Sequence, residues 1–398
     1  MSTPDRKNTT ILDLSPEDEA FREEVSAWLD EHLVGEFADY RGVGSPTDEE
    51  GWHVRRRWEK ELAQGGWLGL SWPTEYGGRG ASLVQEIVYE MEYARHQAPA
   101  RVNFQGQDLF GPTLLRFGSE DLKARFLPGI LSADEVWGQG FSEPGAGSDL
   151  AAIATRAHLE GDHWVINGQK VWTTFGHQAD WLYLIARTDR ESARHHGLTM
   201  LLIKSDAPGV EVRPIKNIAG QGEFSEVFFT DARTPSDLVV GEVGEGWKVA
   251  MGLLGIERGT TLLPMQMSFE REVLRIVEAA QANGCAADPI IRQKLARSLT
   301  DVHVLRATVL RSLAPVIAGN EPGREAAMTK VFASEAHQRI AALALEVQGL
   351  AGQVIEGELS DVQRGSLLSR AESIYGGTSQ IQRNLIGERA LGLPREPR

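Results

Sequence analysis

The sequence is short of features that mark several classes of protein. Cys285 is the only cysteine among 398 residues, so an intrachain disulfide is excluded and a reducing cytoplasm is the expected location. No apolar run approaches the length of a membrane span, and we expect no membrane partner. The formal net charge is −15, so the chain lacks the basic face that a nucleic-acid-binding protein needs.

Common catalytic signatures are missing as well. The ten histidines form no HExxH motif and no Cys/His cluster, which argues against a metal site. The glycine-rich stretch FSEPGAGSDL (141–150) lacks the GxGxxG spacing of a dinucleotide-binding turn. Ser148, within that stretch, is not flanked as the nucleophile of a GxSxG motif is. The chemistry must therefore be sought in other motifs.

A chain of this length predicts two or three domains. Helical patterns fill the first third, β-rich segments fill the middle, and helical patterns return from Gly246. In a doubly wound sheet, by contrast, strands and helices would alternate. The predicted parts are a flexible tail at 1–14, a helical domain at 15–138, a β domain at 139–240 and a helical domain at 241–398.

Local patterns predict individual elements. Ser15 and Ser82 are typical helix N-caps, and Ser379 with Gln382 fits a capping box for the last helix. Asn167-Gly168 predicts a hairpin turn between two β arms. Further strands are predicted to start at Trp181, Leu198, Val210 and Glu226, which makes the middle block antiparallel. Long helices are predicted over 289–313, 324–348 and 379–391.

Three short motifs are candidates for binding, although each has a plainer explanation. The glycines of the 141–150 loop allow close approach of a ligand, but an ordinary interdomain loop has the same composition. Trp172 could stack against a flat ring, and the two threonines after it could hydrogen-bond the edge of that ring. A tryptophan in the hydrophobic core next to two strand-favouring threonines would have the same sequence. The pair Gly376-Gly377 indicates positive φ or a close backbone approach.

Glu257 is the candidate base. It follows Leu254 by three residues and Ala250 by seven, so it shares the mostly apolar face of a predicted helix. Partial desolvation there would raise the pKa of Glu257 and make it a better base near neutral pH. A solvated glutamate at the edge of that face is the alternative.

Three motifs, in this order, resemble the acyl-CoA dehydrogenase family: WGQGFSEPGAGSDL (137–150), NGQKVWTT (167–174) and IYGGTSQIQR (374–383). The resemblance extends from about Ser15 to the end of the chain. It implies an α+β multidomain protein with an N-terminal helical domain, a middle antiparallel β-barrel-like domain and a C-terminal four-helix bundle. It also implies FAD held between subunits of a tetramer, α,β-desaturation of an acyl-CoA, and transfer of electrons to an electron-transfer flavoprotein.

The resemblance also implies roles for individual residues. Those matched to FAD contacts are Gln139, Phe141, Ser142, Ser148, Trp172, Thr174, Thr378 and Gln380, together with Gln348 and Gly352, which match a loop that reaches the flavin of a neighbouring subunit. Those matched to substrate-binding positions are Ser148, Arg258 and Gly377.

The sequence departs from many members of the family at the base. Those members carry a glutamate after the tyrosine of the IYGG motif, where this chain has Gly376. Isovaleryl- and long-chain-type branches place the glutamate on an earlier helix, at a position that matches Glu257. The resemblance then implies that Glu257 takes the α-proton while the β-hydride passes to flavin N5. The backbone N–H of Gly376 would stabilise the enolate oxygen.

A second departure concerns assembly. The stretch EAAQANGCAADPIIRQK (278–294) lacks the Arg-Thr-x-x-Phe-Gly pattern that supports a neighbouring subunit's FAD pyrophosphate in many members. A homotetramer or dimer of dimers, and a heterotetramer with a related chain, therefore both stay open. So do an oxidase that passes electrons to oxygen and a non-catalytic partner subunit. The sequence does not specify the acyl group, nor whether CoA or a carrier protein bears it.

Overall fold

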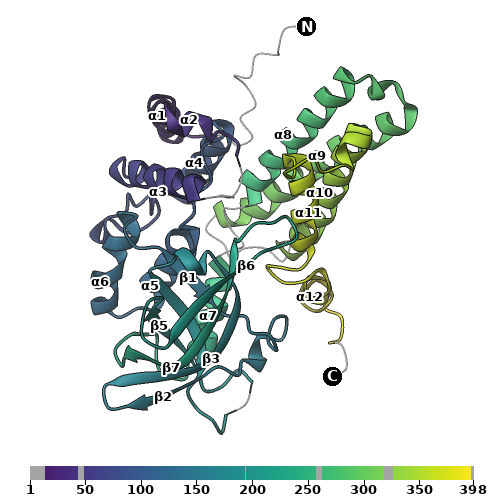
Figure 1. Ribbon diagram of the computed structural model, residues 1–398. Helices are drawn as coiled ribbons and strands as arrows, with labels where there is room; N and C mark the ends of the chain where they lie inside the picture. The colour runs from purple at the N-terminus through teal and green to yellow at the C-terminus, as the bar shows by residue number, and fades with distance from the viewer. Residues whose placement is uncertain (1–13, 44–48, 193, 257–261, 318–325, 396–398) are drawn as a thin grey trace.

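The structure is a computed structural model and describes residues 14–43, 49–192, 194–256, 262–317 and 326–395. Helices, then a sheet, then helices again follow one another along the chain, and they occupy separate regions of the molecule (Figure 1). The predicted α+β multidomain fold is therefore confirmed. In the part of the chain that the structure describes, no helix is both long and apolar enough to cross a lipid bilayer.

The N-terminal region packs its helices around buried aromatic and aliphatic side chains. Ser15 accepts a hydrogen bond from the Asp18 N–H, and Ser82 forms a capping box with Gln85, as the sequence predicted. Trp58 and Leu62 are fully buried in this core. The helices are α1 (Pro16–His32), α2 (Glu36–Asp39), α3 (Glu49–Gln64), α4 (Leu83–Arg95), α5 (Gly111–Phe117) and α6 (Glu120–Leu131).

The middle region is one eight-stranded sheet with the strand order β6-β7-β3-β2-β4-β5-β8, and β1 pairs with β4 outside that path. Most pairs are antiparallel, but β1–β4 and β2–β4 are parallel. The strands are β1 (Trp137–Gly140), β2 (Arg156–Glu160), β3 (His163–Thr174), β4 (Trp181–Arg187), β5 (Leu198–Lys204), β6 (Val210–Ile215), β7 (Phe224–Pro235) and β8 (Val239–Val240).

The predicted hairpin turn at Asn167-Gly168 is wrong. β3 runs straight through these residues, and the turn lies at Gly161-Asp162, between β2 and β3. Gly168 instead forms a bulge opposite β7, with φ at 151°. A Cβ there would lie 2.5 Å from Thr155 Oγ1, so the glycine is needed because the segment just before β2 approaches closely, not because the chain reverses.

The C-terminal helices lie beside both other regions (Figure 1). Residues of α8, α9 and α10 share one apolar core, which includes Val273, Leu305 and Ile340. α7 packs elsewhere, because Val249, Ala250 and Leu253 join the core of the sheet and α5. The helices are α7 (Gly246–Ile256), α8 (Leu262–Ala282), α9 (Pro289–Ile317), α10 (Ala326–Gln348), α11 (Asp361–Leu368) and α12 (Ser379–Leu385).

Candidate active site

The loop that leaves β1 is fastened to β3 beside Trp172. The Val171 N–H donates to the Ser142 carbonyl at 2.9 Å. Phe141 is buried, with its ring edge-on to Tyr183. Two predicted flavin contacts, Ser142 and Trp172, are thereby brought together although thirty residues of chain separate them.

A buried ion pair reinforces this attachment. Lys170 Nζ lies 2.8 Å from Glu143 Oε1 and donates to the Phe141 carbonyl at 3.1 Å. Glu143 also accepts the N–H groups of Ala154 and Thr155. Burial lowers the pKa of Lys170 to about 8, because Glu143 only partly offsets the cost of desolvating the ammonium group. The pair ties both ends of the glycine-rich loop to the centre of β3.

Trp172 has an unusual backbone and an exposed indole. Its φ is 63°, inside the register shift that β3 makes against β7 between Lys170 and Thr173. Positive φ is rare for a bulky residue and indicates local strain. The side chain is 58% exposed, and its only ring contact among the described residues is the edge of Phe224. The bulge therefore presents an aromatic face to solvent, which ordinary core packing does not explain.

Two buried polar atoms in the neighbouring strands lack partners. Thr173 Oγ1, in β3, and Gln139 Nε2, in β1, are buried and have no hydrogen-bond partner among the described residues. Buried polar groups are nearly always paired, by protein, water or ligand. The exposed indole of Trp172 itself suits a flat heteroaromatic group, such as a flavin ring.

The glycine pair lies in a loop after the short helix η7 (Ser369–Ser373). Gly376 and Gly377 have φ values of 60° and 86°, as the sequence predicted. Lys330 Nζ donates to the Gly377 carbonyl at 2.6 Å, and Gln382 Nε2 donates to the Gly376 carbonyl at 2.9 Å. In the described part of the chain, neither glycine N–H has an acceptor. Both carbonyls are thus held, while both N–H groups stay free to bind an oxygen atom.

The predicted capping box at Ser379 is wrong. Thr378 caps α12 instead and accepts the Ile381 N–H at 3.2 Å. The Gln382 side chain does not cap the helix, because its amide donates to the Gly376 carbonyl instead. That bond satisfies a backbone carbonyl of the glycine turn, in which both residues have positive φ.

The other predicted site residues are placed as follows. Ser148 is exposed in the loop after β1, and Thr174 is half-buried at the end of β3. Gln348 ends α10, and Gly352 is buried in the turn that follows it. Gln380 is exposed in the first turn of α12. Glu257 and Arg258 lie outside the described residues.

The sequence did not single out Glu143, Lys170 or Lys330, which orient the two loops, and it gave Gln382 a different role, in a capping box. Lys170 and Lys330 give no sequence signal, because Glu143 and the Gly377 carbonyl that they contact lie 27 and 47 residues away along the chain.

Models of one protein family match nearly the whole chain. The N-terminal domain of acyl-CoA dehydrogenases matches residues 15–134, the middle domain matches 138–232, and the C-terminal domain matches 244–391.

Individual relatives agree with these matches. The acyl-CoA dehydrogenase IpdE1 of Mycolicibacterium smegmatis is 47% identical over 388 residues, covering 94% of this chain and 98% of the relative. The solved Tcur3481-Tcur3483 steroid ACAD has a TM-score of 0.85 at 30% identity, with 96% of this chain and 99% of that chain covered. The ChsE4-ChsE5 complex from Mycobacterium tuberculosis has a TM-score of 0.81 at 31% identity, with 97% and 100% covered.

The family matches and these relatives place the chain among the flavoprotein oxidoreductases. The chain belongs to the acyl-CoA dehydrogenase family, and it is an acyl-CoA dehydrogenase. Members of this family are FAD-dependent, and the exposed indole of Trp172 offers a flat surface that suits a flavin ring.

Proposed function

We propose that this enzyme removes the α-proton of an acyl-CoA with Glu257 while the N–H groups of Gly376 and Gly377 bind the thioester oxygen. The observation that carries the proposal is the glycine turn. Its two carbonyls are held by Lys330 and Gln382, and its two N–H groups have no acceptor among the described residues. Such a turn suits an oxygen on which negative charge develops.

The acidity of the substrate is the chemical difficulty. The α-proton of a thioester is weakly acidic, so a carboxylate in water would hardly remove it. Hydrogen bonds from Gly376 and Gly377 lower the energy of the enolate, and exclusion of water strengthens Glu257 as a base. When bound, FAD supplies the acceptor for the β-hydride.

We assign the flavin ring to the surface formed by Ser142, Trp172 and Thr174, with Gln139, Phe141 and Ser148 alongside. The fastening of the 141–143 loop to β3 supports this assignment, because it brings two of these segments together. Thr378 and Gln380 are assigned to the adenylate part, and Gln348 and Gly352 to the flavin of a neighbouring subunit.

Substrate contacts are proposed for Ser148, Arg258 and Gly377. The similar Tcur3481-Tcur3483 protein is described as a steroid ACAD, which favours a polycyclic acyl group here as well. The test is anaerobic bleaching of bound FAD by a panel of short, branched, long and polycyclic acyl-CoAs. We expect the polycyclic compounds to bleach fastest. If no member of the panel bleaches the flavin, the proposal is wrong.

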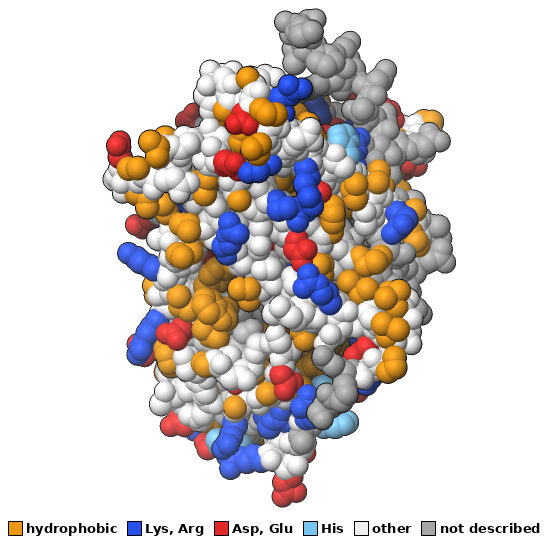
Figure 2. All heavy atoms as spheres, turned by 90° about the vertical axis from the view of Figure 1, so that its right-hand side faces the viewer, with side chains coloured by type: hydrophobic (Ala, Val, Ile, Leu, Met, Phe, Trp, Pro, Cys, Tyr) orange, Lys and Arg blue, Asp and Glu red, His pale blue; other side chains and the backbone are white. Residues whose placement is uncertain are grey.

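A tetramer, in the cytoplasm, that passes electrons to an electron-transfer flavoprotein completes the proposal. The face of the molecule on the side of the C-terminal helices carries hydrophobic side chains among charged ones (Figure 2). In the C-terminal region of the chain, Leu350, Val354 and Ile355 are exposed. Exposed apolar side chains of this kind suit a subunit interface. Peroxide production without the flavoprotein partner would favour an oxidase instead.

A heterotetramer is the second assembly considered. The similar ChsE4-ChsE5 complex is named for two chains, and residues 278–294 of this protein lack the Arg-Thr-x-x-Phe-Gly pattern. Purification of the chain alone separates the cases. Yellow tetramers support a homotetramer, whereas a colourless stable protein supports a partner subunit.

A further inference from the structure

His337 is a half-buried histidine on α10, and each of its ring nitrogens contacts a carboxylate. Nδ1 lies 2.6 Å from Glu372 Oε1, and Nε2 lies 2.9 Å from Glu272 Oε2. The ring stacks on Phe269, with centroids 4.1 Å apart. Both ring nitrogens can donate at once only in the imidazolium form, so this geometry calls for a cation.

The two carboxylates belong to elements next to the proposed catalytic residues. Glu372 lies in η7, four residues before Gly376. Glu272 lies in α8, the helix that begins at Leu262, directly after the stretch that contains Glu257. One side chain therefore connects the element that precedes the glycine turn to the helix that follows the proposed base.

Other bonds from α10 reach the same segment but not α8. Gln338 Nε2 donates to the Ser369 carbonyl and to Ser373 Oγ, both at 3.1 Å. Lys330 Nζ donates to the Gly377 carbonyl. These bonds hold η7 and the turn against α10, whereas His337 also ties them to α8. Unlike the contacts of Gln338 and Lys330, the contact of His337 depends on a side chain whose charge changes within an accessible pH range.

We propose that His337 is a positioning residue: as a cation between Glu272 and Glu372, it holds the segment that carries the glycine turn in place relative to α8, and so orients the N–H groups proposed to bind the enolate oxygen. The inference rests on the proposed roles of Gly376 and Gly377. It extends them by assigning the orientation of the turn to a residue that touches neither the substrate nor the cofactor.

The charge state gives the inference a pH dependence. Burial alone would lower the pKa of His337, but the hydrogen bonds and charges of Glu272 and Glu372 outweigh it and raise the pKa to about 9. A raised pKa means that the charged form stabilises the folded arrangement. That contribution is complete below the ordinary value of 6.5 and is lost as the pH rises through about 9.

Hydrogen–deuterium exchange tests the inference without a substrate. The FAD-loaded, full-length protein, the His337→Gln variant and a control variant, His303→Gln, are compared. His303 is an exposed histidine on α9. After correction for intrinsic exchange, protection of Ile374 and Tyr375, whose N–H groups donate to the Ala371 carbonyl, should fall about tenfold at pH 7 in His337→Gln and stay unchanged in the control. Between pH 7 and pH 10 the wild type should lose protection by a similar factor, and His337→Gln should not.

Two outcomes would overturn the inference. One is unchanged protection of Ile374 and Tyr375 in His337→Gln. The other is a uniform rise in exchange along α8 and α10, which would show a general packing role. If the variant does not fold, the wild-type pH series decides alone, and a series without a step near pH 9 contradicts us. Normal flavin bleaching by Glu257→Gln would refute the proposed base while leaving this exchange result intact, so the two failures are distinguishable.

Discussion

Trp172 combines a strained backbone with an exposed ring. Both features are energetically unfavourable unless the ring stacks on a ligand. We predict that Trp172→Ala raises the FAD dissociation constant about tenfold, because the stacking surface is lost. The free energy of unfolding without FAD should change by less than about 1 kcal/mol, since the indole is largely exposed and its backbone strained. Fluorescence titration with FAD and urea unfolding measure the two quantities. Leu159→Ala, at an exposed apolar site in β2, should leave FAD binding unaltered.

Lys170 and Glu143 give a second prediction at the same scale. Lys170→Met leaves a buried carboxylate without its cation, so unfolding should become easier by about 3–5 kcal/mol. The double variant Glu143→Gln/Lys170→Met removes both charges and should recover much of that loss. Lys216→Met, at an exposed lysine, is the control in urea unfolding. A double variant no more stable than Lys170→Met would show that the pair does not act through charge.

At the scale of elements, β3 makes two register shifts against β7: one contains Trp172, and the other, at Gly168, is where a prediction from the sequence failed. Gly168→Ala brings a Cβ to within 2.5 Å of Thr155 Oγ1 and 2.7 Å of Thr155 Cα, at a positive φ. We expect a loss of about 1–3 kcal/mol in urea unfolding, with reduced FAD content. Gly161→Ala, in the real β2–β3 turn, has positive φ but nothing within 4 Å, so it should cost less. Equal losses would contradict the proposed clash.

The sequence predicted elements well wherever the signal was local. The caps at Ser15 and Ser82 and the strands from Trp181 and Leu198 follow from short patterns, and the structure confirms them. Asn167-Gly168 misled because a glycine needed for a close approach has the same local appearance as a turn glycine. The partners of the Gly376 turn were unpredictable for another reason: Lys330 is nearly fifty residues away, and only folding brings it there.

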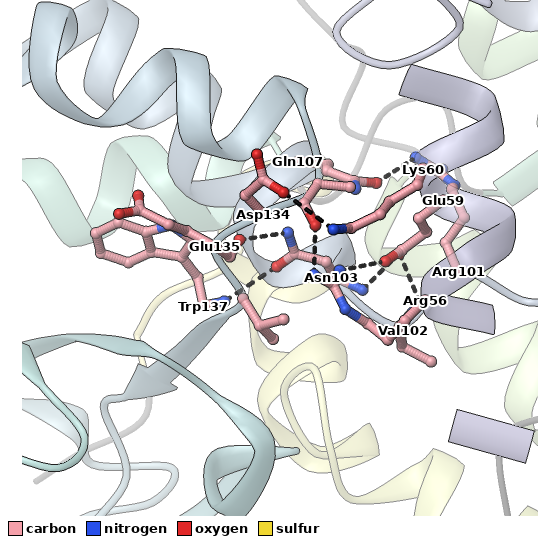
Figure 3. Close-up of polar contacts among 12 residues, drawn as sticks. Arg56, Glu59, Lys60, Arg101, Val102, Asn103, Gln107, Asp134, Glu135 and Trp137 are labelled. Atoms are coloured by element: carbon pink, nitrogen blue, oxygen red, sulfur yellow. Dashed lines mark hydrogen bonds and ion pairs between the residues drawn. The ribbon is translucent and has the colours of Figure 1, made fainter. Parts of the chain in front are cut away.

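At the scale of the whole molecule, one buried carboxylate connects the helices to the sheet. Glu59 of α3 accepts the N–H groups of Val102 and Asn103 at 2.8 and 2.7 Å and pairs with Arg56 (Figure 3). Asn103 in turn accepts the Trp137 N–H at the start of β1. Burial raises the pKa of Glu59, although Arg56 and the backbone donors oppose this.

Removing that carboxylate should therefore weaken the molecule as a whole. Glu59→Ala leaves the N–H groups of Val102 and Asn103 without an acceptor and Arg56 without its carboxylate. We therefore expect the free energy of unfolding to fall by about 3–5 kcal/mol. Glu50→Ala, at an exposed position of the same helix, should cost less than about 0.5 kcal/mol. Tryptophan fluorescence during urea unfolding reports both changes. A loss below about 1 kcal/mol for Glu59→Ala would show that the connection is dispensable.

The most direct test of the central claim is anaerobic flavin bleaching by the best acyl-CoA of the panel in three variants. Glu257→Gln should keep its yellow FAD and bleach at least about 100-fold more slowly, because the base is gone. Glu242→Gln, at an exposed residue, should bleach normally. Adding Gly376→Glu to Glu257→Gln should restore at least about tenfold of the rate, because a carboxylate would again face the α-carbon. Bleaching by Glu257→Gln at the wild-type rate would contradict the account.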